Sequence, residues 1–263
     1  MKVEEVMSKS LICIDVNESV RNALKLMEKK RVSRLLVKRE KKIVGIVTER
    51  DLAERLGSEK ERKLSDAHVH VSSCYSDELI TVEKDVEVKE VAGKMVEKGI
   101  SSIVVTDKGS IVGIVTKTDL IKVLKGCKEP LEKVMQKEVH RIEKGSRLLE
   151  ARKMMIHYGI KKLLVVEKNK LVGILTESDV AKALGLFRKL AEGNHWDEKM
   201  RKILVDDVMS SPVITLKPKD TIDECVKLML ENDISGVAVV EDGEIKGMAT
   251  KTDLVRFIRD SKL

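Results

Sequence analysis

The residues whose type and spacing could do chemistry are a threonine and an aspartate three positions later, a pair that occurs four times. In each copy a glycine and two apolar residues come before the threonine, as in Gly45-Ile46-Val47-Thr48. The pairs are Thr48 and Asp51, Thr116 and Asp119, Thr176 and Asp179, and Thr250 and Asp253. The apolar run indicates a strand, and the residues after each aspartate indicate a helix. We therefore expect each pair at a strand-to-helix turn.

Such a turn suits a phosphorylated sugar. A helix N-terminus offers unpaired N–H groups and about half a positive charge to a phosphate, and a threonine hydroxyl adds another donor. An aspartate on the first turn can accept hydrogen bonds from two adjacent hydroxyls, as in a ribose. The same residues also resemble a capping box, in which they only close the helix end. The two roles are compatible, and both interpretations stay open here.

The elements that must position these pairs repeat with them. Working back from each glycine, a second apolar strand is expected from Val32, Ile100, Ile160 and Ile234. Before it, a helix is predicted because apolar residues recur at helical spacing. These are Val20, Ala23 and Met27; Val88, Val91 and Met95; Leu148, Ala151 and Met155; and Ile222, Cys225 and Met229. The recurrent methionines are interpreted as core packing. One repeat therefore reads strand, helix, strand, strand, helix.

Four such repeats predict a mixed α/β fold (α+β) in which repeats pair, because one unit of this size covers its own sheet poorly. Pairing of consecutive repeats gives two modules, with a boundary near Cys127 to Pro130. The expected first module is 1–127, with repeat 1 at 1–60 and repeat 2 at 61–127. The expected second module is 128–263, with repeat 3 at 128–186, a helical insert at 187–202 and repeat 4 at 203–263.

Composition excludes several classes of protein. The chain has 263 residues, a net charge of +7 with 36% charged residues, and only 2% aromatic residues. Single-strand nucleic-acid binders need exposed rings for base stacking, so that class is nearly excluded. Four scattered cysteines, no signal peptide and no long apolar stretch predict a soluble, cytoplasmic protein with reduced thiols. Abundant Lys and Glu lean towards a thermophile.

The Gly-apolar-x-Thr-x-x-Asp ending, the element order and the tandem count together resemble the cystathionine-β-synthase (CBS) domain family, whose paired repeats are called Bateman modules. The resemblance covers almost the whole chain. It implies two such modules, each paired by a pseudo-twofold axis, that bind adenine nucleotides (AMP, ADP or ATP) as regulatory ligands. No cofactor is required. The expected protein is a sensor whose occupancy is passed to an effector protein or through a homo-oligomer.

The resemblance also assigns roles to residues. The four aspartates hold the ribose hydroxyls, and the four threonines contact the phosphate side. Phosphate contacts are further implied for Ser33, Arg34, Lys161 and Lys162. Repeats 2 and 4 have Ser101-Ser102 and Ser235-Gly236 there, so only repeats 1 and 3 carry cations. The alternative is that these are solvated strand positions.

An apolar slot for adenine is expected from eight residues that could equally be ordinary core. They are Ile12, Val32, Ile80, Ile100, Val139, Ile160, Ile214 and Ile234.

Repeat 2 departs from the pattern at its start. Repeats 1, 3 and 4 open with a Val-Met pair, whereas repeat 2 has Asp66-Ala67-His68-Val69-His70 and then Cys74-Tyr75. His68 and His70, with Asp66 and Cys74, are donors that suit zinc. We predict no metal site here. We interpret the segment as a surface loop that reshapes the mouth of the ligand cleft expected in the first module. Gly236 and Met248-Ala249 suggest a looser site in repeat 4.

No motif for catalysis is present. The chain has no nucleophile elbow, no H-E-x-x-H and no phosphate-binding glycine loop, so we expect no enzyme activity. Three alternatives to an adenine-nucleotide sensor stay open. They are an S-adenosylmethionine sensor, a nucleic-acid-binding protein that uses the basic insert, and a structural adaptor with empty clefts.

Overall fold

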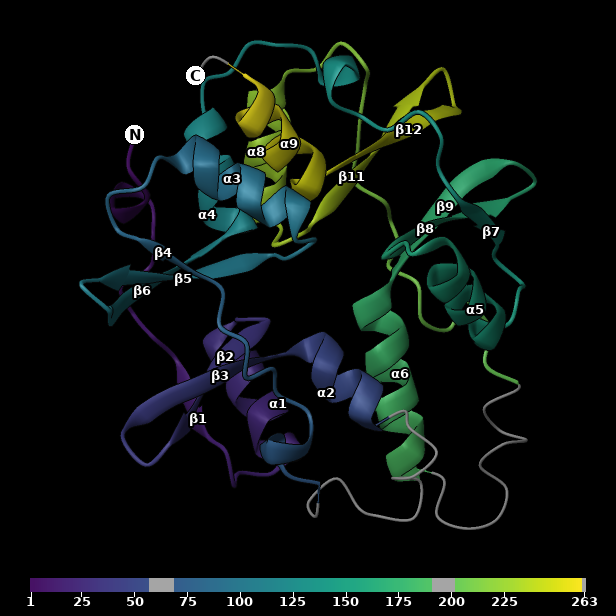
Figure 1. The fold of residues 1–263 in the computed structure, drawn as a ribbon. Helices are drawn as coiled ribbons and strands as arrows, with labels where there is room; N and C mark the ends of the chain where they lie inside the picture. The colour runs from purple at the N-terminus through teal and green to yellow at the C-terminus, as the bar shows by residue number, and fades with distance from the viewer. Residues whose placement is uncertain (57–68, 191–201, 262–263) are drawn as a thin grey trace. The chain divides into compact units, whose positions relative to one another are not determined.

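The computed structural model describes residues 1–56, 69–190 and 202–261, and each of its four repeats has the expected five elements (Figure 1). Repeat 1 comprises β1 (Cys13–Asp15), α1 (Val20–Lys30), β2 (Arg34–Arg39), β3 (Lys42–Thr48) and α2 (Glu49–Leu56). Repeat 2 comprises β4 (Thr81–Glu83), α3 (Val88–Glu97), β5 (Ser102–Asp107), β6 (Ser110–Thr116) and α4 (Lys117–Ile121). Repeat 3 comprises β7 (Arg141–Glu143), α5 (Leu148–Tyr158), β8 (Lys162–Glu167), β9 (Lys170–Thr176) and α6 (Glu177–Leu190). Repeat 4 comprises β10 (Thr215–Leu216), α8 (Ile222–Glu231), β11 (Gly236–Glu241), β12 (Glu244–Thr250) and α9 (Lys251–Asp260). The predicted α/β fold is confirmed.

Each repeat has its own three-stranded sheet. The first strand runs parallel to the second, and the second pairs antiparallel with the third. A parallel pair needs a crossover connection, which the first helix provides, whereas the antiparallel pair is joined by a tight hairpin. In every copy the register shifts by one residue beside the glycine of the third strand, for example between Val37 and Lys38 next to Gly45.

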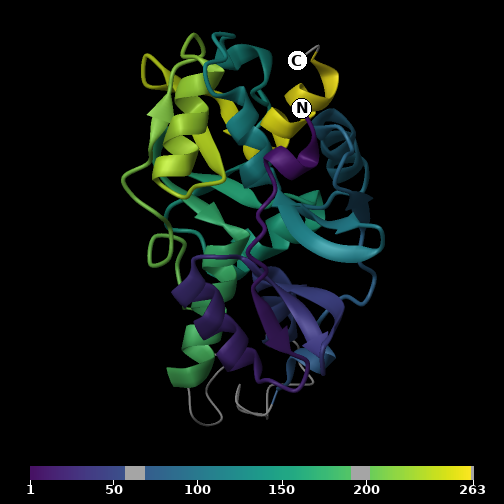
Figure 2. The ribbon, with the colours of Figure 1, turned by 90° about the vertical axis from the view of Figure 1, so that its left-hand side faces the viewer.

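The first helix of each repeat covers one face of its sheet with the residues that helical spacing selected. Figure 2 shows α1 (purple) lying against the strands of its repeat. Val20, Ala23 and Met27 of α1 are at most 1% exposed and pack with strand residues such as Ile14 and Val37. Met95, Met155 and Met229 are buried in the same way. The interpretation of the recurrent methionines as core residues is therefore confirmed.

By backbone contacts the chain divides into two compact units. Unit 1 consists of residues 1–11, 80–139 and 213–263, and so contains repeats 2 and 4. Unit 2 consists of residues 12–79 and 140–212, and contains repeats 1 and 3. In unit 1 α9 packs against α3 and α4, and in unit 2 α2 packs against α6 (Figure 1). The pairing of consecutive repeats into modules 1–127 and 128–263 stays a prediction.

The short segment that precedes each repeat packs on the neighbouring repeat rather than on its own. We call these four stretches the leading segments: residues 3–8, 71–76, 131–136 and 205–210. Backbone bridges join Ser8 to Ile114, Ser76 to Ile46, Gln136 to Met248 and Ser210 to Ile174. The first apolar residue of every leading segment, Val3, Val71, Leu131 or Val205, is completely buried. Repeats 1 and 2 thus exchange segments, and so do repeats 3 and 4.

This exchange corrects our interpretation of the start of repeat 2. The described part of that stretch is no surface loop, because Val71 is completely buried and starts a 3-10 helix at Val71–Ser73. Repeats 1 and 3 have the same short 3-10 helix, at Val3–Glu5 and Leu131–Lys133, and repeat 4 has the buried Val205 at this place. Cys74-Tyr75 occupies the position of the Val-Met pair, so the segment is an equivalent anchor with a different side chain. The residue types differ from those of the other repeats, but the backbone bridge, from Ser76 to Ile46, is the equivalent one.

The predicted helical insert is described only in part. Residues 187–190 belong to α6, which continues past the expected end of repeat 3 at 186, and residues 191–201 lie outside the described residues. Across the three described stretches of the chain, no helix combines the length and the apolar character needed to cross a membrane.

Candidate functional site

The four threonine–aspartate pairs form the same hydrogen-bonded corner. We call these sites the Thr–Asp corners. In the corner of repeat 3, Oδ2 of Asp179 accepts the backbone N–H of Thr176 at 2.9 Å and its hydroxyl at 2.7 Å. The N–H of Asp179 donates back to the Thr176 hydroxyl at 3.2 Å. The corners of repeats 1, 2 and 4 repeat this arrangement with distances between 2.5 and 3.4 Å. The capping interpretation is therefore confirmed for all four copies.

The second carboxylate oxygen, Oδ1, separates the repeats into two kinds. In repeat 2, Oδ1 of Asp119 accepts from Lys122 at 2.9 Å. In repeat 4, Oδ1 of Asp253 accepts from Gln136 at 2.7 Å and from Arg256 at 3.0 Å. Within the part of the chain that the structure describes, Oδ1 of Asp51 and of Asp179 has no such partner. Asp51 and Asp179 are also half-buried, whereas Asp119 and Asp253 are buried at 9% and 4% exposure.

The helix ends offer fewer free donors than the sequence suggests. The first N–H of each of these helices donates to the carbonyl of the residue just before the second strand of the same repeat. Glu49 donates to Ser33 and Glu177 to Lys161 at 3.0 Å, and Lys117 donates to Ser101 and Lys251 to Ser235 at 3.1 Å. The third N–H, that of the aspartate, donates to the threonine. A phosphate at a corner would therefore depend on side-chain cations more than on the helix end.

The cations expected on the phosphate side lie next to the corners. Arg34 is the strand partner of Thr48, and Lys162 is the strand partner of Thr176, so their Cα atoms are about 5 Å from those of the threonines. Arg34 and Lys162 are half-buried. Arg34 also donates to the Ser33 hydroxyl at 3.1 Å. Ser33 and Lys161 are exposed, so they are the outer members of the expected set.

Sequence reasoning missed the residue that directly follows each threonine. In unit 1 it is a lysine, and the two lysines bond reciprocally: Lys117 donates to the Thr252 hydroxyl and Lys251 to the Thr118 hydroxyl, both at 2.9 Å. In unit 2 it is a glutamate. Glu49 accepts from the Ser178 hydroxyl at 3.0 Å, and Glu177 pairs with Arg50 at 3.3 Å. The alternation of Glu and Lys along the four repeats was the signal for which helices meet.

The glycine of each motif is required by the leading segment that crosses it. A Cβ on Gly45 would overlap the carbonyl oxygen of Ser76, and one on Gly247 would overlap that of Gln136. At Gly113 a Cβ would be 2.6 Å from the Met7 sulfur and 3.0 Å from the Ser8 oxygen. At Gly173 it would overlap the Met209 sulfur. The motif glycine therefore reports the exchange of leading segments.

The positions expected to form an adenine slot lie at the edge of the core. All eight expected residues are half-buried, and six of them pack against core clusters: Ile12, Val32, Ile80, Ile100, Ile160 and Ile234. One assignment is wrong by one residue. The strand register aligns Ile142 with Ile14 and Val82, so His140, not Val139, is the repeat 3 equivalent of Ile12 and Ile80. The first strand has only three residues, Arg141–Glu143, too few for the apolar pattern to define its register.

The described residues contain no group of His, Cys, Asp and Glu side chains that could hold a metal ion. His68 and Asp66 lie outside the described residues. Nδ1 of His70 is 2.6 Å from the Asn17 carbonyl, which occupies one of its ring nitrogens. Burial raises the pKa of the Cys74 thiol to about 11, and this disfavours the thiolate that a zinc ligand must supply.

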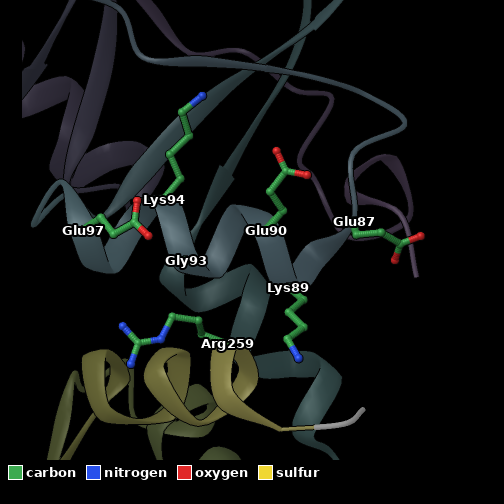
Figure 3. Close-up of a pocket in the computed structure, with 7 residues that line it drawn as sticks. All are labelled: Glu87, Lys89, Glu90, Gly93, Lys94, Glu97 and Arg259. Carbon is green, nitrogen blue, oxygen red and sulfur yellow. The ribbon is translucent and has the colours of Figure 1, made fainter.

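An open pocket in unit 1 is a poor match for a nucleotide. It is lined by Glu87, Lys89, Glu90, Gly93, Lys94, Glu97 and Arg259. Figure 3 shows these charged side chains along α3 and at the end of α9. Because this lining offers no apolar slot for a base, and Arg259 is in the last turn of α9 whereas Asp253 is in the first, we do not assign the pocket to the Thr–Asp corners.

Comparison with known proteins gives the family. The model of the CBS domain matches residues 3–58, 71–126, 131–186 and 205–260. The chain therefore belongs to the CBS-domain family.

Two similar proteins match almost the whole chain. The chain is 25% identical over 277 residues to the protein MJ1225 of Methanocaldococcus jannaschii, with 98% of each chain covered. The crystal structure of MJ1225, described as a candidate archaeal homologue of g-AMPK, matches with a TM-score of 0.81 at 23% identity, over 98% of this chain and 99% of that one. A conserved protein of Pyrococcus horikoshii matches with a TM-score of 0.67 at 21% identity, over 98% of this chain and all of that one. At these identities the structural likeness shows the fold.

Proposed function

We propose that this protein binds an adenine nucleotide at its Thr–Asp corners and acts as a regulatory sensor. The observation that carries the proposal is the state of Asp51 and Asp179. In both, Oδ2 closes the helix while Oδ1 has no hydrogen-bond partner among the described residues. One carboxylate can thus cap its helix and still accept from a ribose hydroxyl, which reconciles the two interpretations of the motif.

The neighbouring residues support a phosphorylated ligand. Arg34 and Lys162 stand opposite the threonines of the same two repeats, so ribose acceptor and phosphate cation occur together in repeats 1 and 3. The positive sulfonium of S-adenosylmethionine fits poorly beside these cations. The description of MJ1225 as a candidate homologue of g-AMPK is consistent with a sensor of this kind.

Occupancy would act through the relative arrangement of repeats. A ligand shifts a conformational equilibrium only by its differential affinity for the states, and an effector protein or a second copy of the chain would read the shift. We expect no catalysis, because no histidine stands next to any of the four corner aspartates in the sequence to act as a general base.

We also infer that consecutive repeats form the functional pairs, 1–127 and 128–263. The exchange of leading segments supports this pairing, because each pair holds both of its exchanged contacts. A fragment of residues 128–263 should fold, whereas a control fragment of residues 61–186 has lost both partners of its leading segments. Circular dichroism and cooperative urea unfolding test this, and folding of 61–186 alone would contradict the pairing.

Isothermal titration calorimetry with AMP, ADP, ATP, S-adenosylmethionine and duplex DNA tests the ligand. Asp51→Asn and Asp179→Asn keep an oxygen for the threonine and lose the charge. We expect about 10- to 150-fold weaker binding at the changed site, from hydrogen bonds to a charged group worth about 1.5–3 kcal/mol.

The chain offers a matched control in the capping box of α8. There Glu224 accepts from the Thr221 N–H at 2.7 Å and from its hydroxyl at 2.8 Å, outside the four corners. Glu224→Gln should weaken that cap without changing nucleotide affinity. If no adenosine compound binds, the sensor proposal fails, and if DNA alone binds with a steep salt dependence, the nucleic-acid alternative replaces it.

A further inference from the structure

Repeat 3 contains a cluster of rings at the edge of its core. The rings of His140 and Tyr158 have centroids 4.3 Å apart with an interplanar angle of 31°, and the ring of His157 meets that of Tyr158 edge-on at 4.7 Å. Within the described stretches these are the only ring-to-ring contacts. Tyr158 is 52% exposed and His140 is half-buried, so the pair borders solvent.

His140 is at one adenine-slot position of repeat 3, and Tyr158 is two residues before the other, Ile160. The His140 carbonyl accepts the Leu164 N–H at 3.1 Å, which fixes His140 beside β8. His140 is two residues before the buried Ile142 and therefore lies on the same face of the sheet, the face that α5 covers. Tyr158 ends α5, and Gly159, with φ of 63°, turns the chain so that Ile160, the second slot position, follows. One ring is thus at the first slot position and the other is two residues before the second slot position in the chain.

No other repeat has these rings. The position of His140 holds Ile12, Ile80 and Ile214 in repeats 1, 2 and 4. The position of Tyr158, three residues after the core methionine, holds Lys30, Lys98 and Asn232. A buried core does not require this pair, because the other three repeats fill the same core without it and Tyr158 itself is half exposed.

We propose that His140 and Tyr158 form a stacking platform for the purine base of a nucleotide bound in the repeat 3 slot. The inference rests on the proposed function and adds that one slot recognises its base by stacking on rings rather than by aliphatic contact alone. The two rings meet at an interplanar angle of 31° with centroids 4.3 Å apart, and aromatic groups favour offset-stacked or edge-to-face contacts with one another, which a purine base could add. Removing a ring on which a base stacks weakens binding of the nucleotide by about 5- to 150-fold.

The test compares a ligand that has a base with one that lacks it. Tyr158→Lys introduces the side chain found in repeats 1 and 2, and Tyr158→Phe keeps the ring. Titration calorimetry of the full chain measures AMP and ribose 5-phosphate. We expect Tyr158→Lys to weaken binding of AMP by about 5- to 150-fold at one site and to leave binding of ribose 5-phosphate unchanged. Tyr158→Phe should bind AMP like the parent.

A second measurement locates the base. Photolabelling with 8-azido-AMP followed by peptide mass spectrometry should place label within residues 138–162, and Tyr158→Lys should remove it. If Tyr158→Lys disturbed folding in general, binding of AMP and binding of ribose 5-phosphate would weaken together. Tyr158→Phe, which keeps the ring, is the control for this.

The outcomes separate the two proposals. If the parent binds AMP but Tyr158→Lys binds it equally well, or if label appears only in other repeats, the platform is refuted while the sensor proposal stands. If the parent binds no adenine nucleotide, both fail.

Discussion

Gly247→Ala is the sharpest test of the exchanged leading segments. The added Cβ would overlap the carbonyl oxygen of Gln136 and lie 3.2 Å from its carbon. Both are backbone atoms that cannot rotate away. The same stretch is held by two backbone hydrogen bonds, from Gln136 N–H to the Met248 carbonyl and from Met248 N–H to the Gln136 carbonyl, each 2.9 Å.

The expected loss follows from these contacts. Overpacking against fixed atoms costs about 1–3 kcal/mol. Breaking two net hydrogen bonds adds about 1 kcal/mol each. The free energy of unfolding should therefore fall by about 3–5 kcal/mol, which lowers the melting temperature by about 6–20 °C at ~2–4 °C per kcal/mol for a chain of this size.

Urea unfolding followed by circular dichroism measures the loss, and two other glycines calibrate it. At Gly173 the obstructing atom is the end of the flexible Met209 side chain, so Gly173→Ala should cost less. Gly145→Ala meets nothing within 4 Å and should be neutral or slightly stabilising. The threshold is about 1 kcal/mol, the size of one net hydrogen bond. If the free energies of unfolding of Gly247→Ala and Gly145→Ala differ by less than this, the crossing segment is not the reason that the motif needs a glycine.

Three further outcomes are expected. Lys162→Ala should weaken ATP by about 10- to 100-fold and adenosine little, because only the phosphates need the cation; equal losses in calorimetry would remove Lys162 from the phosphate side. The Gly126 N–H and Lys227 lower the pKa of Asp223, so its contribution to stability is present above the ordinary carboxyl pKa and is lost as pH falls through the lowered one. Urea midpoints between pH 6 and 2 should therefore fall less in Asp223→Asn than in the parent, and parallel curves would contradict this. Burial raises the pKa of the Cys225 thiol to about 12, so alkylation at pH 8 should modify it only in denaturant, and labelling of the native protein would show that the core opens.

Much of the fold could be predicted because each repeat obeys local rules. Helical spacing selected Val20, Ala23 and Met27 as buried residues, and all three are at most 1% exposed. Repetition strengthened weak local signals, since one pattern recurred four times. The prediction failed where the signal was short or borrowed from a distant segment. The first strands have two or three residues, too few to fix a register, so the apolar pattern indicates Val139 where the strand register has His140.

The candidate site was foreseen in part. The threonines, aspartates, Arg34 and Lys162 were found from their spacing or from resemblance, and the structure places them at one corner in repeats 1 and 3. The difference between aspartates with a paired and an unpaired Oδ1 could not be predicted. A cation three residues later pairs with Asp119 and with Asp253, but Lys182, at the same place in repeat 3, pairs with Glu49. Asp253 also accepts from Gln136, which is 117 residues away in the chain.

The sequence alone determined the repeat, its element order and the capped Thr–Asp turn, because these depend on neighbours within a few residues. Only the tertiary structure decided which segment crosses each motif glycine, which carboxylate oxygens lack a hydrogen-bond partner among the described residues, and that a histidine and a tyrosine ring contact each other in repeat 3. Those features depend on where segments and side chains meet in the folded chain, and local spacing carries no record of that.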